Sequence, residues 1–268
     1  MKKRITLQFT ILAFAIAYAV WAICIVSGQF GITLTNDMWL YIPYLLGALA
    51  PSIASYVVLK KNNKVTGFKE WLKNVFNFRT HIVHYLLIIL VLAIYFIPRI
   101  FIAGLKEMYP FYMFFLMLPA MVMGGGLEES GWRYILQPEL DKKYGFIFSS
   151  IFVAVIWSVW HLPLFFIPAV AQYGANFGLF ALQILGSSFV MGAIRKISGR
   201  VSLCILAHSM ANAGLSTFIV NETFLGNAIP TGLVITVSTV AVYIHNQKRR
   251  AKERTWEGKE GMPKSPCC

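Results

Sequence analysis

Charged residues are scarce in this 268-residue chain, at 13% of the total, whereas 57% of the residues are hydrophobic. A soluble domain of this size needs far more polar surface, so the composition excludes an ordinary soluble protein. The apolar residues come in blocks of about 20, the length that crosses a bilayer core about 30 Å thick. The chain is therefore predicted to be an integral membrane protein, with the lipid bilayer as a partner.

Acidic residues are scarcer than basic ones, with 11 Asp and Glu against 24 Lys and Arg and a net charge of +13. Such an excess can indicate nucleic-acid binding, but the sequence shows no basic face and no nucleic-acid-binding motif. Lys and Arg instead lie in short clusters between the apolar blocks, as in the cytoplasmic loops of membrane proteins. We therefore expect no nucleic-acid partner.

Cysteine is also rare, and four cysteines do not make a disulfide framework. Cys24 and Cys204 lie inside apolar blocks and are predicted to be buried thiols, whereas Cys267 and Cys268 end the chain. The sequence shows no internal repeat and no soluble segment. We expect a single integral membrane domain over residues 1–268.

The apolar blocks predict an all-α, polytopic fold of about eight transmembrane helices. The predicted spans are 7–27, 38–59, 83–103, 111–136, 147–168, 177–195, 201–220 and 226–245. Basic clusters occur in alternate connections: at the start of the chain, in 60–82, at 142–143, at 195–200 and in the tail 246–268. By the positive-inside rule, this alternation places both termini in the cytoplasm of a multi-pass cell-membrane protein.

One apolar block ends in an unusual group of ionisable residues, within GGGLEESGWR at residues 124–133. An ionisable residue inside the bilayer costs about 2.5–3.5 kcal/mol on insertion, so Glu128, Glu129 and Arg133 need compensation. Glu129 and Arg133 are four residues apart and share a helix face, whereas Glu128 points elsewhere. On this segment alone, a structural ion pair at a helix end is as good an interpretation as a site for chemistry.

Two further spans carry polar residues that favour chemistry. Of the five histidines, His161 and His208 alone lie inside predicted spans. His161, in WSVWHLP, has Trp157 one turn earlier on the same face, and His208, in LAHSMANAG, has Asn212 one turn later. At 1.5 Å per residue these groups and the first glutamate lie roughly 10 to 21 Å from the cytoplasmic ends of their spans. We therefore expect them to meet in an intramembrane cavity that opens to the cytoplasm.

Three motifs follow one another on successive predicted helices: Glu-Glu-x-x-x-Arg from residue 128, Trp-x-x-x-His from 157 and His-x-x-x-Asn from 208. Together they resemble the CAAX-protease and bacteriocin-processing (CPBP) family of intramembrane endopeptidases. This family is also called the Abi family, and it includes the type II CAAX prenyl endopeptidases. The resemblance covers about residues 111–220. Trp157 stands where the second motif usually has Phe, which is also aromatic.

The resemblance implies an intramembrane endopeptidase that hydrolyses peptide bonds with a glutamate- and histidine-activated water. Its substrate would be a membrane-associated peptide or a lipidated protein. The implied roles fall on the motif residues: Glu128 as general base, Glu129 and Arg133 as the rest of the first motif, His161 as a water-holding group, and His208 and Asn212 as oxyanion stabilisers.

A metal is an alternative at the same residues, because the family is often described as metalloproteases. Glu128, His161 and His208 would be a plausible zinc set. The sequence has no His-Glu-x-x-His motif, however, and a glutamate-activated water needs no metal. The expected cofactor is therefore either none or zinc, and we prefer none.

Other functions stay open from the sequence. A bacteriocin self-immunity protein or a membrane scaffold protein would need no catalysis. A transporter also places Glu and His inside the membrane, but transporters usually show repeats or paired broken helices. The sequence does not identify the substrate or tell whether it is prenylated.

Overall fold

The computed structural model describes residues 2–260, and the side chains of residues 5–253. Cys267 and Cys268 lie outside the described residues, whereas Cys24 and Cys204 are buried free thiols, as predicted. The helices, in chain order, are α1 (Lys2–Gln29), α2 (Tyr41–Ala48), α3 (Ala50–Lys61), α4 (Phe68–Val75), α5 (Ile82–Ala103), α6 (Tyr112–Met123), α7 (Glu129–Gly131), α8 (Gln137–Trp160), α9 (Phe177–Ser198), α10 (Val201–Thr217) and α11 (Phe224–Glu260). The all-α class is confirmed.

Among the described residues, five helical segments are long and apolar enough to cross a membrane: Ile5–Gln29, Ile82–Ala103, Tyr112–Phe166, Phe177–Ser198 and Phe224–Glu253. A sixth is counted if Met38–Ala48 and Ala50–Lys61, which are bent by 47°, form one broken span. The multi-pass architecture is therefore confirmed. The number of about eight spans stays a prediction, because Tyr112–Phe166 contains two predicted spans and α10 has only 17 residues.

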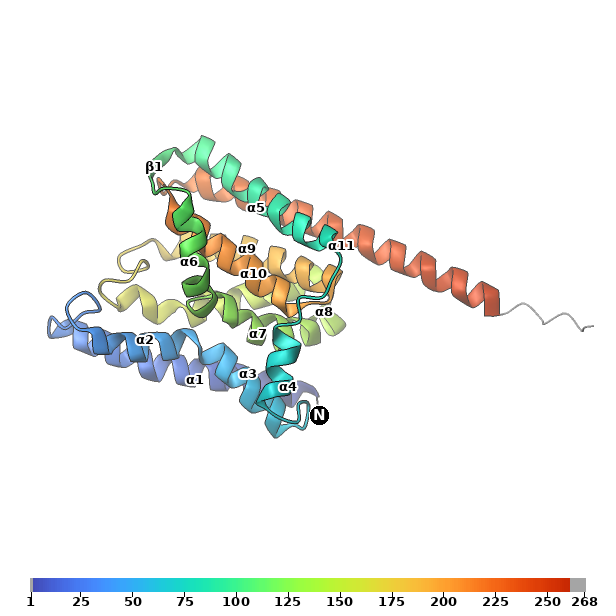
Figure 1. Ribbon diagram of the computed structural model, residues 1–268, viewed down its shortest axis with the longest axis horizontal. Helices are drawn as coiled ribbons and strands as arrows, with labels where there is room; N and C mark the ends of the chain where they lie inside the picture. Colours follow the sequence, from blue (N-terminus) through green and yellow to red (C-terminus); the bar gives the residue numbers. More distant parts are fainter. Residues whose placement is uncertain (1, 261–268) are drawn as a thin grey trace, which may run out of the picture.

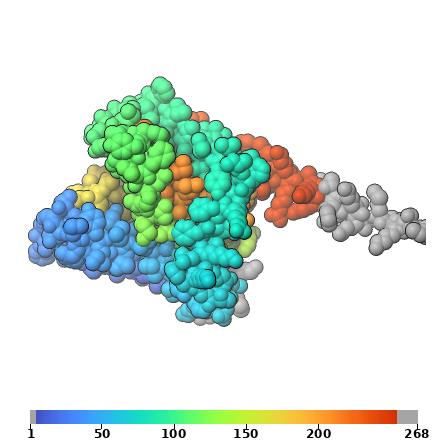
Figure 2. Space-filling view, in the orientation of Figure 1, coloured from blue at the N-terminus to red at the C-terminus, as the bar shows by residue number. Residues whose placement is uncertain are grey.

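The helices are arranged in layers, with α1, α2 and α3 on one side and α5 and α11 on the other (Figure 1). Between them lie α8, α9 and α10; α9 packs on α8, α10 and α11. On the face drawn in the space-filling view, α10 is seen as a strip between α6 and the α4–α5 region (Figure 2). Polar side chains of the inner layer are buried, among them His161, Ser188 and His208.

The connections separate by charge, as the sequence predicted. The N-terminus, α4 and the far end of α11 lie toward one end of the bundle, and β1 lies at the other end (Figure 1). The basic residues around α4 and in the far part of α11 belong to the first end. The positive-inside rule assigns that end to the cytoplasm, and this orientation stays a prediction.

A small sheet closes the end with few basic residues, where only helices were predicted. β1 (Leu105–Met108) pairs antiparallel with β2 (Phe218–Val220), with Leu105 opposite Val220. The predicted span over 201–220 is therefore too long, because α10 ends at Thr217. Aromatic and β-branched residues suit a strand once a partner strand is adjacent, and the sequence pattern did not show that partner.

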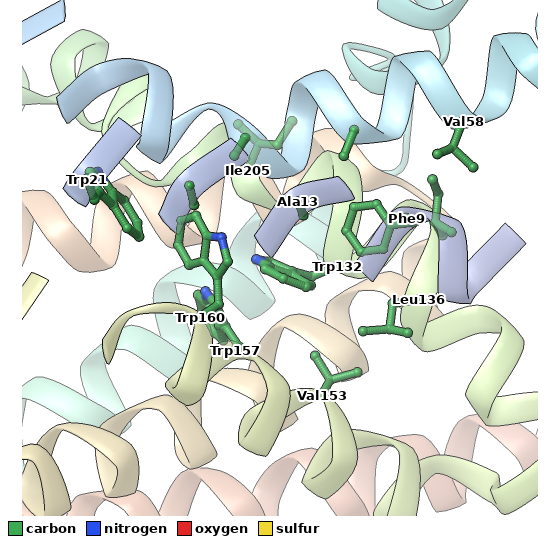
Figure 3. Packing of buried hydrophobic residues seen from close by; sticks show 14 of the residues in the cluster. Phe9, Ala13, Trp21, Val58, Trp132, Leu136, Val153, Trp157, Trp160 and Ile205 are labelled. Carbon is green, nitrogen blue, oxygen red and sulfur yellow. The ribbon is translucent and has the colours of Figure 1, made fainter. Parts of the chain in front are cut away.

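Tryptophan side chains make up much of the core beside the polar layer (Figure 3). The ring of Trp160 lies 4.8 Å from that of Trp21 and 5.8 Å from that of Trp132, and all three are fully buried. The hydroxyl of Tyr18 donates to the carbonyl of Val159 at 2.6 Å. These contacts fix α1 against the end of α8, where the second motif lies.

Candidate active site

The glycines before the two glutamates interrupt the helix that was predicted as one span over 111–136. α6 ends at Met123, Gly126–Glu128 form a 3-10 turn, and the short α7 leads into a π-helical turn over Trp132–Leu136. The predicted span over 111–136 is therefore not one regular α-helix. Glycine favours such a break because it costs helical stability, and π-helical turns are frequent at functional sites.

Close backbone contacts hold this irregular segment in place. The hydroxyl of Ser52, on α3, donates to the carbonyl of Leu127 at 2.7 Å, and the hydroxyl of Ser130 donates to Ser52 at 3.0 Å. A Cβ atom at Gly126 would lie 2.3 Å from Oγ of Ser209, on α10. Only glycine lets the segment approach α10 so closely, and this approach carries the glutamates into the inner layer.

The carboxylate of Glu128 is buried and oriented by two indole groups. Nε1 of Trp157 donates to Oε2 of Glu128 at 2.7 Å, and Nε1 of Trp132 donates to the same oxygen at 3.4 Å. Both bonds end on Oε2, and no other described residue forms a hydrogen bond with Oε1 of Glu128. Glu128 therefore has one fixed oxygen and one that is available to a water or substrate.

Glu129 and Arg133 pair, as their spacing predicted. Nε of Arg133 lies 3.5 Å from Oε2 of Glu129, and both side chains are 0% exposed. The guanidinium also lies 5.3 Å from the ring centroid of Trp157. Among the described residues none forms a hydrogen bond with the Arg133 guanidinium nitrogens, so the ion pair and the aromatic ring compensate its charge.

Glu129 has a second contact that the sequence did not predict. Its Oε1 lies 3.0 Å from Nδ1 of His208. Since a carboxylate accepts, Nδ1 of His208 carries a proton and Nε2 is the ring nitrogen left for another partner. Glu129 therefore connects Arg133 with His208 and sets the orientation of the imidazole.

His161 is oriented in a similar way by a different acceptor. Its Nδ1 lies 2.8 Å from the carbonyl oxygen of Trp157, so Nδ1 donates and Nε2 carries a lone pair in the neutral ring. The rings of Trp160 and Phe180 pack edge-on at centroid distances of 4.7 and 5.1 Å. In both histidines Nδ1 is engaged and Nε2 is free. The partner of Nδ1 is a carboxylate only in His208.

Asn212 and His208 converge on the backbone of Gly125. A Cβ atom at this glycine would lie 2.4 Å from Nδ2 of Asn212 and 3.1 Å from Nε2 of His208. A side chain here would therefore collide with both polar groups. Gly125, the second of the three glycines, keeps open the space beside these two nitrogens.

One cavity of about 590 Å³ brings the predicted residues together: Glu128, His161, His208 and Asn212 all line it. Glu129 and Arg133 are outside its lining and lie behind Glu128 and His208. The lining also includes residues within 171–176 and 218–222, in connections that have no basic cluster. The positive-inside rule assigns such connections to the outer side. The opening of the cavity toward the cytoplasm therefore stays a prediction.

The predicted zinc set does not form a metal-binding cluster. Among the side chains of residues 5–253, the structure places no group of three His, Cys, Asp or Glu so that they could hold a metal ion. The indoles engage Oε2 of Glu128, and the Nδ1 bonds of His161 and His208 leave Nε2 of each ring free. The absence of zinc stays a prediction, and no step below involves a metal.

Several residues of the site were not identified from the sequence. Trp132 orients Glu128, Gly125 leaves room for Asn212, and Ser52 anchors the turn from another helix. The run of three glycines next to the glutamates was a usable signal for Gly125. Ser52 gave no signal, because its partners are 75 and 78 residues away in the chain.

Comparison with known proteins gives two matches. Residues 110–214 match the family model of type II CAAX prenyl endopeptidase Rce1-like proteins. CAAX prenyl protease 2 of Methanococcus maripaludis is 24% identical over 225 residues, which are 76% of this chain and 81% of that protein. The matched segment contains all three motifs and most of the cavity's polar wall. Residues 110–214 are therefore similar to the Rce1-like domain of type II CAAX prenyl endopeptidases, which confirms the resemblance predicted from the motifs.

Proposed function

We propose that this protein cleaves a peptide bond of a membrane-associated peptide or lipidated protein, with a water molecule that Glu128 activates. The proposal rests on one observation above all. Glu128, His161, His208 and Asn212, from three separate segments of the chain, line the same buried cavity. Polar groups are costly inside a membrane, so their convergence on a cavity is better explained by chemistry than by packing.

Glu128 would act as the general base. The indoles of Trp157 and Trp132 hold Oε2, so Oε1 would accept the proton of the attacking water. His161 would hold the same water, because its Nε2 accepts a hydrogen bond when Nδ1 donates to Trp157. The water would thus be fixed by two acceptors before it reaches the scissile carbonyl.

His208 and Asn212 would stabilise the oxyanion that forms on the carbonyl oxygen. Nδ2 of Asn212 and Nε2 of His208 lie on the same side of Gly125, so two donors can converge on one oxygen. Donation from Nε2 requires His208 to carry both ring protons, and the carboxylate of Glu129 compensates that charge. Preorganised donors of this kind contribute about 3–4 kcal/mol to catalysis.

Glu129 and Arg133 would be positioning residues. They do not line the cavity, and Glu129 acts through Nδ1 of His208. Arg133 holds Glu129 through the ion pair and packs on Trp157, which in turn orients Glu128. The first motif would therefore combine one residue for proton transfer with a pair that orients the oxyanion donor.

Mapping of protein termini in membranes would test the proposal. Membranes would be compared from cells that lack the protein and from cells complemented with wild type, Glu128→Gln or Glu139→Gln. Glu139 pairs with Lys142 on the surface, so Glu139→Gln is a matched control outside the cavity. We expect new peptide termini with wild type and Glu139→Gln, and none with Glu128→Gln at equal protein abundance.

Two outcomes would contradict the proposal. The first is that Glu128→Gln generates the same termini as wild type. The second is that no variant generates new termini while all of them restore the phenotype of the missing protein. The second outcome would favour a self-immunity or scaffold function, which needs the folded protein and no hydrolysis.

A further inference from the structure

Pro138 follows the first motif and interrupts the backbone hydrogen bonds of the π-helical turn. In this turn, over Trp132–Leu136, the N–H of Gln137 donates to the carbonyl of Trp132, five residues earlier. The next bond of the series would join the N–H of residue 138 to the carbonyl of Arg133. Proline has no N–H, so the series supplies no donor for that carbonyl.

Arg195, on α9, supplies the missing donor. Its Nε donates to the carbonyl oxygen of Arg133 at 3.0 Å, although the two residues are 62 positions apart in the chain. A carbonyl without a partner is costly in a membrane protein, because the hydrocarbon core holds no water that could replace the bond. Arg195 lies in the last turn of α9, where the helix dipole also favours a cation. The guanidinium therefore takes the place of the N–H that residue 138 lacks.

Neighbouring contacts hold α9 against the start of α8. A Cβ atom at Gly192 would lie 2.2 Å from Nε2 of Gln137, so α9 approaches the end of the turn closely. Lys196, next to Arg195 in the chain, pairs with Asp141 on α8 at 3.1 Å. The two adjacent cations of α9 thus have different partners: Arg195 binds the first motif, and Lys196 binds the helix that follows it.

The turn held by Arg195 carries two side chains of the proposed active site. Nε1 of Trp132 donates to Oε2 of Glu128 at 3.4 Å, and Arg133 pairs with Glu129 at 3.5 Å. The Arg133 guanidinium forms no hydrogen bond with another described residue, so its position depends strongly on its backbone. Arg195 is not among the residues that line the cavity. It therefore affects chemistry only through the residues of the turn.

We propose that Arg195 is a positioning residue of the proposed active site: it replaces the backbone donor that Pro138 lacks and so fixes the π-helical turn of the first motif. In a regular α-helix a proline ring collides with the carbonyl four residues earlier, here that of Tyr134. Pro138 thus prevents a regular helix, and Arg195 satisfies the carbonyl that is left over. This inference rests on the proposed function, because it assigns a role toward the same site.

A pair of variants tests this exchange of donors. Arg195→Met removes the donor at similar side-chain length, and Pro138→Ala restores a backbone N–H. In membranes of complemented cells, at equal amounts of folded protein, Arg195→Met should generate the wild-type termini at least about tenfold more slowly, because small misplacements of catalytic groups are costly. The double variant Pro138→Ala/Arg195→Met should recover most of the rate. Arg195→Lys keeps a donor and should also retain most of it.

Lys196→Met is the matched control. It removes the neighbouring cation of the same helix and breaks its ion pair with Asp141, but it leaves the first motif untouched. Its rate of cleavage, at equal amounts of folded protein, should equal that of wild type. A rate as low as that of Arg195→Met would overturn the inference, because the effect would then belong to the packing of α9 in general.

Hydrogen–deuterium exchange of the full-length protein in detergent gives a second measurement, which needs no cleavage. The amides of residues 132–137 should exchange at least about tenfold faster in Arg195→Met, because the turn opens more often. The double variant should restore their protection, and Lys196→Met should leave it unchanged. If Arg195→Met does not accumulate in cells, accumulation of the double variant supports the inference, and equal loss of both contradicts it.

Failure of this inference is distinguishable from failure of the proposed function. Cleavage by Arg195→Met at the wild-type rate would overturn the inference, and so would a double variant that recovers neither the rate nor the protection. If wild type generates no termini, the proposed function fails, and hydrogen exchange alone decides whether Arg195 fixes the turn.

Discussion

Replacing Glu129 by glutamine should destabilise the protein more than any other conservative change in the first motif. The substitution leaves Arg133 as a buried cation without its anion, because both side chains are 0% exposed. Breaking a buried pair in this way costs about 3–5 kcal/mol. The remaining contact of Arg133 is the ring of Trp157, whose attraction to a cation is worth at most about 2 kcal/mol.

The assay is thermal unfolding in detergent, followed by tryptophan fluorescence. A loss of about 3–5 kcal/mol should lower the melting temperature by on the order of 10 °C, taking about 2–4 °C per kcal/mol for a chain of this size. Glu128→Gln should melt near wild type, because an amide oxygen can still accept from the indole of Trp157. Glu139→Gln breaks only a surface pair with Lys142, whose contribution is about 0–1 kcal/mol.

A double variant separates charge from shape. Glu129→Gln combined with Arg133→Met removes both charges, and replacing a buried pair by apolar groups is often neutral. We therefore expect the double variant to recover most of the lost stability. If Glu129→Gln melts within about 2 °C of Glu139→Gln, the buried pair does not stabilise the fold as described. If the double variant is less stable than the single one, the uncompensated cation is not the cause.

The remaining predictions concern activity, metal and topology. Gly125→Ala should abolish cleavage, measured at equal amounts of folded protein, because its Cβ would lie 2.4 Å from Nδ2 of Asn212. Gly232→Ala, with nothing within 4 Å of its Cβ, should cleave normally. Cleavage by both variants would contradict the convergence of donors at Gly125. Enzyme stripped with a strong chelator should keep its activity, and loss of activity that only zinc restores would reverse this expectation. Single cysteines at Lys143 and Gln172, in a cysteine-free background, should be labelled from the cytoplasmic and the outer side respectively, and external labelling at position 143 would refute the orientation.

The sequence by itself determined the class of the protein and the residues at its centre. Apolar blocks of bilayer length specify membrane helices because a backbone in lipid must satisfy its own hydrogen bonds. Glu128, His161 and His208 were identifiable because polar groups are rare and costly in such blocks. The ion pair between Glu129 and Arg133 followed from helical spacing, which is a local property.

Only the tertiary structure decided how these residues act together. The bond from Glu129 to His208 joins positions 79 residues apart, and that from Arg99 to Glu222 joins positions 123 apart. Helical periodicity relates residues within a few turns and carries no information on such distances. The helix break after α6 depended on contacts with α10. The end of α10 depended on the pairing of β2 with β1. The fold decides these features because each requires a partner from a distant part of the chain.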